Sequence, residues 1–341
     1  MYDAIIAGAG PAGSAAAMAL AERGGRVLLA DRCALPRYKS CSGMLIEKTL
    51  ELTERYFGRA VPAEAVCAPA ENRGMVFADD RGREYRFEQL GLNVWRSGYD
   101  HFLARRAEEQ GAELRDRTPV LSCREEGDGV AVALGGDAPR TERARYLIVC
   151  EGVTGSLRRK LTGAQRDFIT TYQTFNRGRI GLDPHYFYAY LQPELSGYDA
   201  WFNVKDDQLV LGVSAADPRE IDGYYRRFLA YMGERWGLRL EETLRGERWL
   251  MPRVRPGCPV ELGRGRVLFA GEAAGFLNPM GEGISAALES GHQAALAAAA
   301  CPDHPDRALT AYLEGTEELR RYMVRQWRFT ARLAGTFREM A

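Results

Sequence analysis

A glycine pattern close to the start of the chain, G-x-G-x-x-G at residues 8–13, constrains the fold more than any other feature of the sequence. The apolar residues 5–7 precede it and predict a short buried parallel strand. The alanine-rich run 11–23 predicts a helix, and the apolar run 27–30 predicts a second buried strand that ends at Asp31. A strand, a helix and a strand within about thirty residues form a βαβ unit.

Each glycine of this pattern has a mechanical role in such a unit. Gly8 permits the tight turn out of the strand, Gly10 lets a pyrophosphate approach the backbone, and Gly13 lets the helix pack on the strand. The phosphates then meet free N–H groups at the positive end of the helix dipole, which stabilises an exposed anion by about 0.3–1 kcal/mol. The carboxylate of Asp31 can accept hydrogen bonds from ribose hydroxyls. The unit therefore predicts a dinucleotide site.

A second segment near the end of the chain indicates which dinucleotide is bound. Residues 265–283 predict a strand, a turn of small residues that bears Glu272, and a loop that leads into a helix N-terminus. Such a segment can offer an acceptor to ribityl hydroxyls and direct N–H groups at the pyrimidine edge of a flavin, where negative charge accumulates on reduction. We therefore expect the cofactor to be FAD and not a nicotinamide nucleotide.

Three motifs in order give the chain a resemblance to a known family. These are the glycine pattern 8–13, the segment Cys150-Glu151-Gly152, and the segment 271–275 followed by residues 278–283. The chain resembles, over nearly its whole length, the aromatic hydroxylase superfamily of flavoproteins and more closely its geranylgeranyl reductase branch. Glu151 and Glu272 stand where that family has aspartate, so each carboxylate must reach its partner along a longer path.

The resemblance and the residue chemistry together nominate the residues that bind the cofactor. The segment that begins at Arg96 resembles the family segment that opens a helix and contacts the flavin's linker, and the guanidinium of Arg37 suits a phosphate. The loop 38–43 resembles the reductase loop that places a cysteine, here Cys41, beside the flavin. The residues expected to bind FAD are Gly8, Gly10, Pro11, Ala12, Gly13, Asp31, Arg32, Arg37, Cys41, Ser42, Gly43, Arg96, Val120, Glu151, Gly152, Gly271, Glu272, Pro279, Gly281, Glu282, Gly283 and Ile284.

The reductase resemblance implies a reaction in which reduced flavin delivers a hydride to an alkene of a prenyl or other apolar substrate. Cys41 is then a candidate for positioning the substrate or supplying a proton, although a small buried cysteine is equally common as a core residue. The segment 188–193 resembles that family's Y-x-W-x-F-P strand. The residues expected to line a substrate pocket are Tyr188, Tyr190, Trp201 and Phe202, with plain sheet core as the competing interpretation.

Three other functions remain open at this stage. The first is a flavin monooxygenase, which acts through a flavin hydroperoxide on the same fold. The second is a halogenase, disfavoured because Trp249 is followed by Leu-Met-Pro and no W-x-W-x-I-P segment is present. The third is a flavin-binding redox sensor or subunit without turnover.

The remaining patterns predict a mixed α/β protein in which a Rossmann-type FAD-binding domain is interrupted by a mostly antiparallel substrate domain. Further helices are expected at 43–57, 99–110, from 283 onward and at 317–337, and further strands at 75–77, 85–87, 130–134, 146–150, 170–213 and 267–270. The FAD-binding domain is predicted to comprise residues 1–65, 93–157 and 258–341, and the substrate domain residues 66–92 and 158–257.

Composition excludes several classes of function. The formal net charge is zero, which gives no field for nucleic acid. The seven scattered cysteines include no C-x-x-C, so we expect no metal or disulfide framework and a reducing cytoplasm. No apolar stretch is long enough to cross a bilayer, and the arginine-rich run 317–337 leaves at most peripheral membrane contact. Since no second dinucleotide fold is visible, electrons would come from transiently bound NAD(P)H or a ferredoxin-like carrier.

Overall fold

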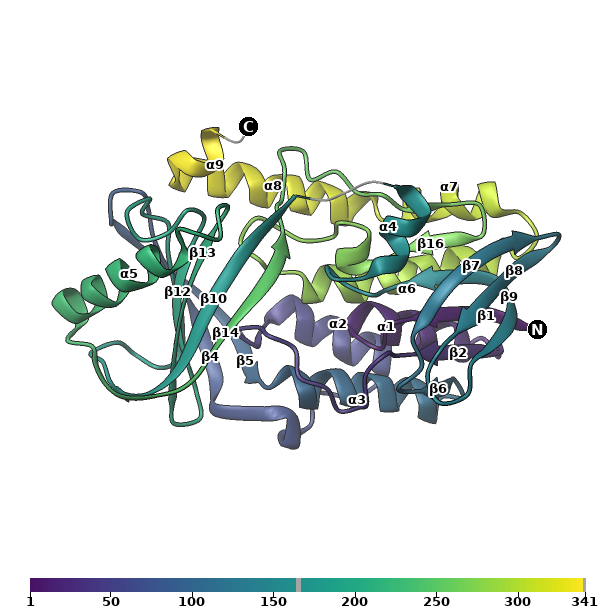
Figure 1. The fold of residues 1–341 in the computed structure, drawn as a ribbon, viewed down its shortest axis with the longest axis horizontal. Helices are drawn as coiled ribbons and strands as arrows, with labels where there is room; N and C mark the ends of the chain where they lie inside the picture. The colour runs from purple at the N-terminus through teal and green to yellow at the C-terminus, as the bar shows by residue number, and fades with distance from the viewer. Residues whose placement is uncertain (164–166, 340–341) are drawn as a thin grey trace.

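Two eight-stranded sheets organise the computed structural model, which describes residues 1–163 and 167–339 (Figure 1). Sheet A has the strand order β15-β16-β9-β1-β2-β6, with the hairpin β7-β8 joined to β9. Its strands are β1 (Tyr2–Ala7), β2 (Val27–Ala30), β6 (Glu113–Arg115), β7 (Val120–Glu126), β8 (Gly129–Leu134), β9 (Arg140–Val149), β15 (Gly263–Arg264) and β16 (Val267–Phe269).

The centre of sheet A is parallel and almost wholly buried. Strand β1 pairs in parallel with β2 and with β9, and β16 pairs in parallel with β9. Every residue of β2 and β16 is buried, as the uninterrupted apolar runs predict for strands covered on both faces. The first strand, helix and strand of the chain therefore form the predicted βαβ unit.

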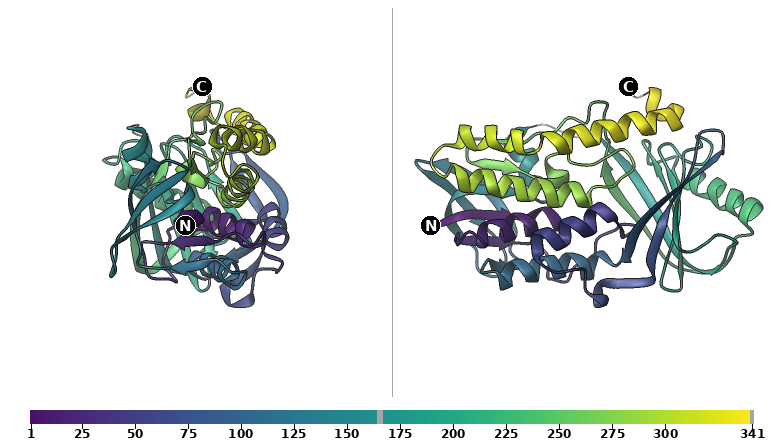
Figure 2. Two further views of the ribbon diagram at one scale, coloured as in Figure 1. Left: turned by 90° about the vertical axis from the view of Figure 1, so that its right-hand side faces the viewer. Right: turned by 180° about the vertical axis from the view of Figure 1, so that it is seen from behind.

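Most of the helices pack around sheet A, where α1 and α6 lie against each other and α7 and α8 continue along the same side (Figure 2). The C-terminal helices reach the second sheet, because Phe329 of α8 packs on Phe87 of that sheet with ring centroids 5.6 Å apart. The helices are α1 (Pro11–Ala21), α2 (Glu47–Phe57), α3 (Arg96–Glu109), α4 (Ser156–Thr162), α5 (Ile221–Trp236), α6 (Ile284–Ala300), α7 (Pro305–Gly315), α8 (Glu317–Leu333) and α9 (Gly335–Glu339). Within the described ranges, none of them is long and apolar enough to cross a membrane.

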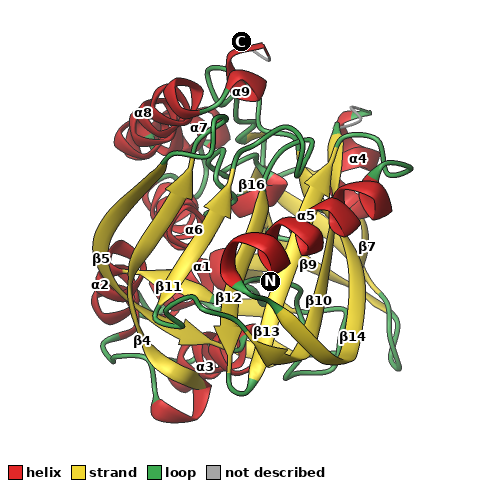
Figure 3. Ribbon diagram, turned by 90° about the vertical axis from the view of Figure 1, so that its left-hand side faces the viewer, coloured by secondary structure: helices red, strands yellow, loops and turns green. Residues whose placement is uncertain are grey.

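Sheet B has the order β14-β10-β13-β12-β11-β4-β5-β3, and all of its pairs are antiparallel except β11 with β4. Helix α5 covers one of its faces (Figure 3). Its strands are β3 (Met44–Ile46), β4 (Val66–Ala78), β5 (Glu84–Val94), β10 (Phe168–Arg179), β11 (Tyr186–Tyr190), β12 (Ala200–Lys205), β13 (Gln208–Ala215) and β14 (Arg239–Pro252). The predicted combination of a Rossmann-type sheet and a mostly antiparallel sheet is confirmed.

The predicted helix 43–57 begins with a strand in the structure, and the predicted helix 317–337 contains a break. Residues 44–46, expected to be helical, form β3 because they extend along residues 91–93 of β5, and the helix begins only at Glu47. The predicted helix 317–337 is broken at Ala334, whose backbone is extended between α8 and α9. Since β3 pairs in sheet B, the segment 1–65, predicted to belong to the FAD-binding domain, contributes β1 and β2 to sheet A and β3 to sheet B.

Candidate active site

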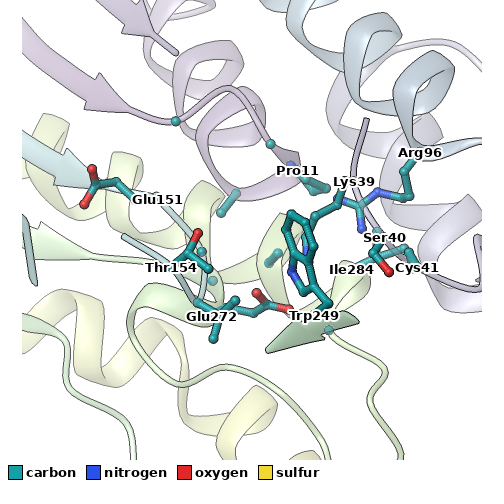
Figure 4. A pocket seen from close by; sticks show the side chains of 18 of the residues that line it. Pro11, Lys39, Ser40, Cys41, Arg96, Glu151, Thr154, Trp249, Glu272 and Ile284 are labelled. Carbon is teal, nitrogen blue, oxygen red and sulfur yellow. The ribbon is translucent and has the colours of Figure 1, made fainter. Parts of the chain in front are cut away.

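One elongated cavity runs from the carboxyl ends of the parallel strands of sheet A to the face of sheet B opposite α5 (Figure 4). This is the edge at which doubly wound sheets bind ligands, because the loops that follow the strands diverge there. Glu151 and Thr154 lie towards one end, Arg96, Ser40 and Cys41 lie towards the other, and Glu272 lies between them (Figure 4). The motifs at the two ends of the sequence therefore share a single space.

The glycine turn has the predicted geometry. Gly8 has φ +106°, and a Cβ on it would stand 2.6 Å from the carbonyl oxygen of Cys150. A Cβ on Gly13 would stand 1.8 Å from the carbonyl oxygen of Gly8, so Gly13 serves the packing of α1 and does not line the cavity. Gly10 does line the cavity, and α1 begins there without a capping side chain or an acidic first turn. Its first N–H groups are therefore available to an anion.

The carboxylate of Asp31 lies at the end of β2 as expected and lines the cavity. It accepts hydrogen bonds from the backbone N–H of Ala9 at 2.8 Å and of Cys33 at 2.9 Å. These bonds fix the carboxylate against the glycine turn. Arg32 and Val120, also predicted, line the cavity as well.

Arg37 and Arg96 share one buried carboxylate. Asp100, whose side chain is 1% exposed, pairs with Arg37 at 3.1 Å and with Arg96 through two hydrogen bonds of 2.7 and 3.0 Å. Arg37 also reaches Asp31 at 3.3 Å. Both arginines line the cavity, so Asp100 orients two cations at its wall.

The loop that follows Arg37 is held against sheet B by a polar network that the sequence did not reveal. The hydroxyl of Tyr38 donates to Glu247 at 2.7 Å, and burial raises the pKa of Tyr38, so the hydroxyl remains a donor at neutral pH. The amide of Gln173 donates to Ser40 at 3.2 Å and to Glu247 at 2.6 Å. Cys41 and Ser42 line the cavity as predicted. Gly43 does not, and instead packs beneath the loop, where a Cβ would stand 2.0 Å from the carbonyl oxygen of Val94.

The two glutamates that replace the family's aspartates behave differently. Glu151 uses its extra length to accept a hydrogen bond from the backbone N–H of Leu157 at 3.0 Å, in the first turn of α4, and burial raises its pKa. In Figure 4 its carboxylate is turned away from Glu272. Glu272 stays at the cavity, and its Oε2 would stand 3.5 Å from a Cβ on Gly152.

The late loop contributes Gly271, Gly281, Gly283 and Ile284 to the cavity, as predicted, together with Met280. Pro279 and Glu282, also predicted, do not line it. Glu282 instead caps α6, because its carboxylate accepts 2.9 Å hydrogen bonds from both the backbone N–H and the hydroxyl of Ser285. An acid directly before a helix favours this local bond over a reach into the cavity.

Sheet B divides its aromatic residues between its two faces. Tyr188, Tyr190 and Phe202, predicted to line a substrate pocket, lie on the α5 side, where Tyr190 packs on Phe228 with ring centroids 5.5 Å apart. The structure therefore does not bring these three residues to the cavity. Trp201 does line it, as predicted, because successive side chains of a strand point to opposite faces.

The other cavity residues of sheet B and its connections were missed. Phe187 alternates with the tyrosines of β11, and this alternation was visible in the sequence, although nothing there indicated which face was covered by a helix. Trp249 lies under the ammonium of Lys39, which is 5.0 Å from its ring. The full set that was missed here is Thr171, Gln173, Phe187, Asp199, Trp249, Leu250 and Met251.

This arrangement fits a long anionic dinucleotide. Gly10 and the uncapped N-terminus of α1 suit its phosphates, Asp31 suits a ribose, and Gly281 and Gly283 leave the backbone open to a planar ring. Among the described residues, no group of three or more His, Cys, Asp or Glu side chains could hold a metal ion.

Comparison with known proteins agrees with this fit. The sequence profile of the family described as FAD binding domain matches residues 1–212. The geranylgeranyl diphosphate reductase of Rhodobacter capsulatus is 28% identical over 312 residues, which cover 88% of this chain and 75% of that protein. The 12-dehydrotetracycline 5-monooxygenase/anhydrotetracycline 6-monooxygenase of Streptomyces rimosus is 34% identical over 194 residues, which cover 54% of this chain and 35% of that protein.

Among solved structures, a geranylgeranyl bacteriochlorophyll reductase-like protein from Thermoplasma acidophilum superposes with a TM-score of 0.84 at 20% identity, covering 97% of this chain and 87% of that one. A likeness at this identity establishes the fold. The chain therefore belongs to the FAD-binding domain family and is an FAD-dependent oxidoreductase similar to the geranylgeranyl reductases.

Proposed function

We propose that this protein reduces carbon–carbon double bonds of a prenyl or other apolar substrate. The observation that carries the proposal is the continuity of the cavity from the glycine turn to an apolar wall on sheet B, formed by Phe187, Trp201, Trp249 and Met251. A cofactor bound along the loops of sheet A would present its reactive ring to this wall, where an alkene could lie against it.

Bound FAD supplies a hydride acceptor and donor at this position. The protein's own residues bind and orient it: the first turn of α1 receives the pyrophosphate, and Arg37 and Arg96 provide positive charge beside it. The N-terminus of α6, with Gly283 and Ile284 at the cavity, offers N–H groups to developing negative charge on the ring. The wall on sheet B excludes water from the alkene.

Two further assignments belong to this proposal. Cys41 lies at the cavity, with its sulfur 3.3 Å from the backbone N–H of Gly43, and positions the substrate against the cofactor ring. Electrons arrive from NAD(P)H bound transiently or from a ferredoxin-like carrier. The substrate is small and apolar, and a lipid is compatible with the aromatic wall.

A flavin monooxygenase is the second candidate, favoured by the 34% identity shared with the tetracycline monooxygenase over 194 residues. The two proposals differ in the role of oxygen.

The discriminating experiment is anaerobic. The purified protein is reduced with NADPH, NADH or dithionite, and its reoxidation is then followed against prenyl lipids and against aromatic acids. The reductase proposal predicts reoxidation by an alkene without oxygen and a product two hydrogens heavier. Reoxidation only by oxygen, with an oxygen atom in the product, would reject the reductase proposal and support the monooxygenase. A protein that binds FAD and is reduced, but that none of these substrates reoxidises, would indicate a sensor or subunit.

A further inference from the structure

A single carboxyl group reaches the cavity from the substrate side. Asp199 stands immediately before β12, on the same face as Trp201, and both line the cavity. The other carboxylates of the cavity wall, Asp31, Glu151 and Glu272, all follow strands of sheet A or its connections. Among the described residues, Asp199 is therefore the acid that the cavity presents beside the apolar wall.

The register of sheet B gives Asp199 a neutral partner. Because Ala200 pairs with Val213 in β13, Asp199 lies opposite Ser214. The hydroxyl of Ser214 donates a hydrogen bond to the carboxyl oxygen Oδ1 of Asp199. The same hydroxyl oxygen accepts a hydrogen bond from the backbone N–H of Asp199 at 3.1 Å. The described residues give the other oxygen, Oδ2, no hydrogen bond, and they place no cation within ion-pair distance of Asp199.

The groups around Asp199 leave its charge uncompensated. Tyr198 precedes it in the chain, and the surroundings of Tyr198 include Cys258 and Arg253 from the segment after β14. Burial raises the pKa of Asp199 to about 6, and the hydroxyl of Ser214 offsets part of that rise. A carboxyl group with a pKa of about 6 is protonated in mildly acidic solution and keeps a protonated fraction near neutral pH, so it can give a proton to a substrate.

We propose that Asp199 is the general acid that protonates the substrate carbon during double-bond reduction. This inference rests on the proposed function, because only an alkene reduction requires that proton. One alkene carbon forms a C–H bond with the hydride supplied by reduced flavin, and the π electron pair moves to the neighbouring carbon. That carbon takes the proton from the carboxyl oxygen of Asp199, and the resulting carboxylate keeps the hydrogen bond of Ser214 and regains a proton from water.

The first test is a single-turnover measurement. Asp199→Asn keeps the shape but has no acidic proton, whereas Asp199→Glu keeps the acid, and Asp207→Asn removes an exposed aspartate from the turn between the same two strands. Each reduced enzyme is mixed anaerobically with a prenyl alkene over a range of pH. We expect Asp199→Asn to slow reoxidation by about 10²–10⁴-fold and to abolish the fall of the rate above the pKa of the acid. Asp199→Glu should recover part of the rate, and Asp207→Asn should match the wild type.

The second test requires no cofactor. The infrared band of a protonated carboxyl group in the cofactor-free protein should titrate with a pKa of about 6 and should be missing in Asp199→Asn. An unaltered rate and pH profile in Asp199→Asn, with the wild type active, would overturn the role of Asp199 alone. A wild type that is reduced normally but reduces no alkene would overturn the proposed function, and this inference with it.

Discussion

The indole of Trp201 lies across Gly212 of the neighbouring strand, so close that a Cβ on Gly212 would stand 2.1 Å from Cζ2 of the indole. Residues 201 and 212 face each other in the register of β12 and β13. The absence of a side chain at 212 thus lets the indole lie flat on the sheet, and the cavity above it stays open.

Replacing Gly212 with alanine should push the Trp201 indole into the cavity. Overpacking of this kind costs about 1–3 kcal/mol of stability. We expect Gly212→Ala to raise the KM for the substrate, to change the tryptophan fluorescence and to leave FAD binding intact. The control is Gly233→Ala in α5, where the nearest atom to a new Cβ is 3.9 Å away. Equal KM values for Gly212→Ala and the wild type would show that substrate does not use this part of the wall.

Asp100 should matter for stability more than any exposed acid. Removing one member of a buried ion pair leaves an uncompensated charge and costs about 3–5 kcal/mol. Asp100→Ala leaves Arg96 without its two hydrogen bonds and Arg37 with Asp31 alone. Urea unfolding of the cofactor-free protein should show this loss, whereas Asp207→Asn should leave the midpoint nearly unchanged. If Asp100→Ala loses little unfolding free energy, water must replace the carboxylate of Asp100 as the partner of the two arginines.

The raised pKa of Asp199 predicts a pH dependence of stability. The folded protein binds this proton more tightly than the unfolded chain, so the stability contributed by the proton is complete below the unfolded pKa, about 3.8, and is lost as pH rises through about 6. As the pH rises from 4 to 7, the unfolding free energy of Asp199→Asn should therefore increase by about 2–3 kcal/mol relative to that of the wild type. Unfolding free energies across this range provide the measurement. A difference that does not vary with pH would contradict the raised pKa.

Cys41→Ser tests the role of the thiol at the cavity. The hydroxyl is smaller and can accept the Gly43 N–H bond, so FAD content should stay normal. If Cys41 positions the alkene, the substitution should lower the rate of reoxidation by substrate while leaving reduction by NADPH unchanged. Turnover equal to that of the wild type would remove Cys41 from the mechanism. Cys301→Ser, at the C-terminal end of α6 and not among the residues that line the cavity, is the matched control.

Local patterns predicted the cofactor half of the fold, and long-range packing determined the rest. The strand before Gly8 and the helix after Gly10 could be read directly, because the constraint and the residues that satisfy it lie within one βαβ unit. The sequence could not predict which face of sheet B lines the cavity. Only the packing of α5 makes Tyr190 a core residue and leaves Phe187 at the cavity.

Dependence on long-range packing also explains why the hydrogen-bond partners of Glu151 and Glu282 were not predicted. Glu272, which the sequence nominated as a cofactor residue, lines the cavity. Nothing local indicated that Glu282 would cap α6 or that Glu151 would turn to α4. The backbone N–H groups that Glu282 and Glu151 bind come within reach only when the loops before α6 and α4 are folded. Asp199 was missed for a related reason, because its importance depends on burial and on a partner, Ser214, fifteen residues away.

We expect one FAD molecule to lie in this cavity with its pyrophosphate at the first turn of α1. An equilibrium FAD titration of the wild type and of Gly10→Val measures this directly. Gly10 opens the cavity at that turn, so a branched side chain there would occupy the space of the phosphates. We predict one FAD per wild-type chain and, for Gly10→Val, an affinity reduced by at least about a hundredfold with unchanged far-UV circular dichroism. Equal affinities for the two proteins would mean that the pyrophosphate of FAD does not lie at this turn.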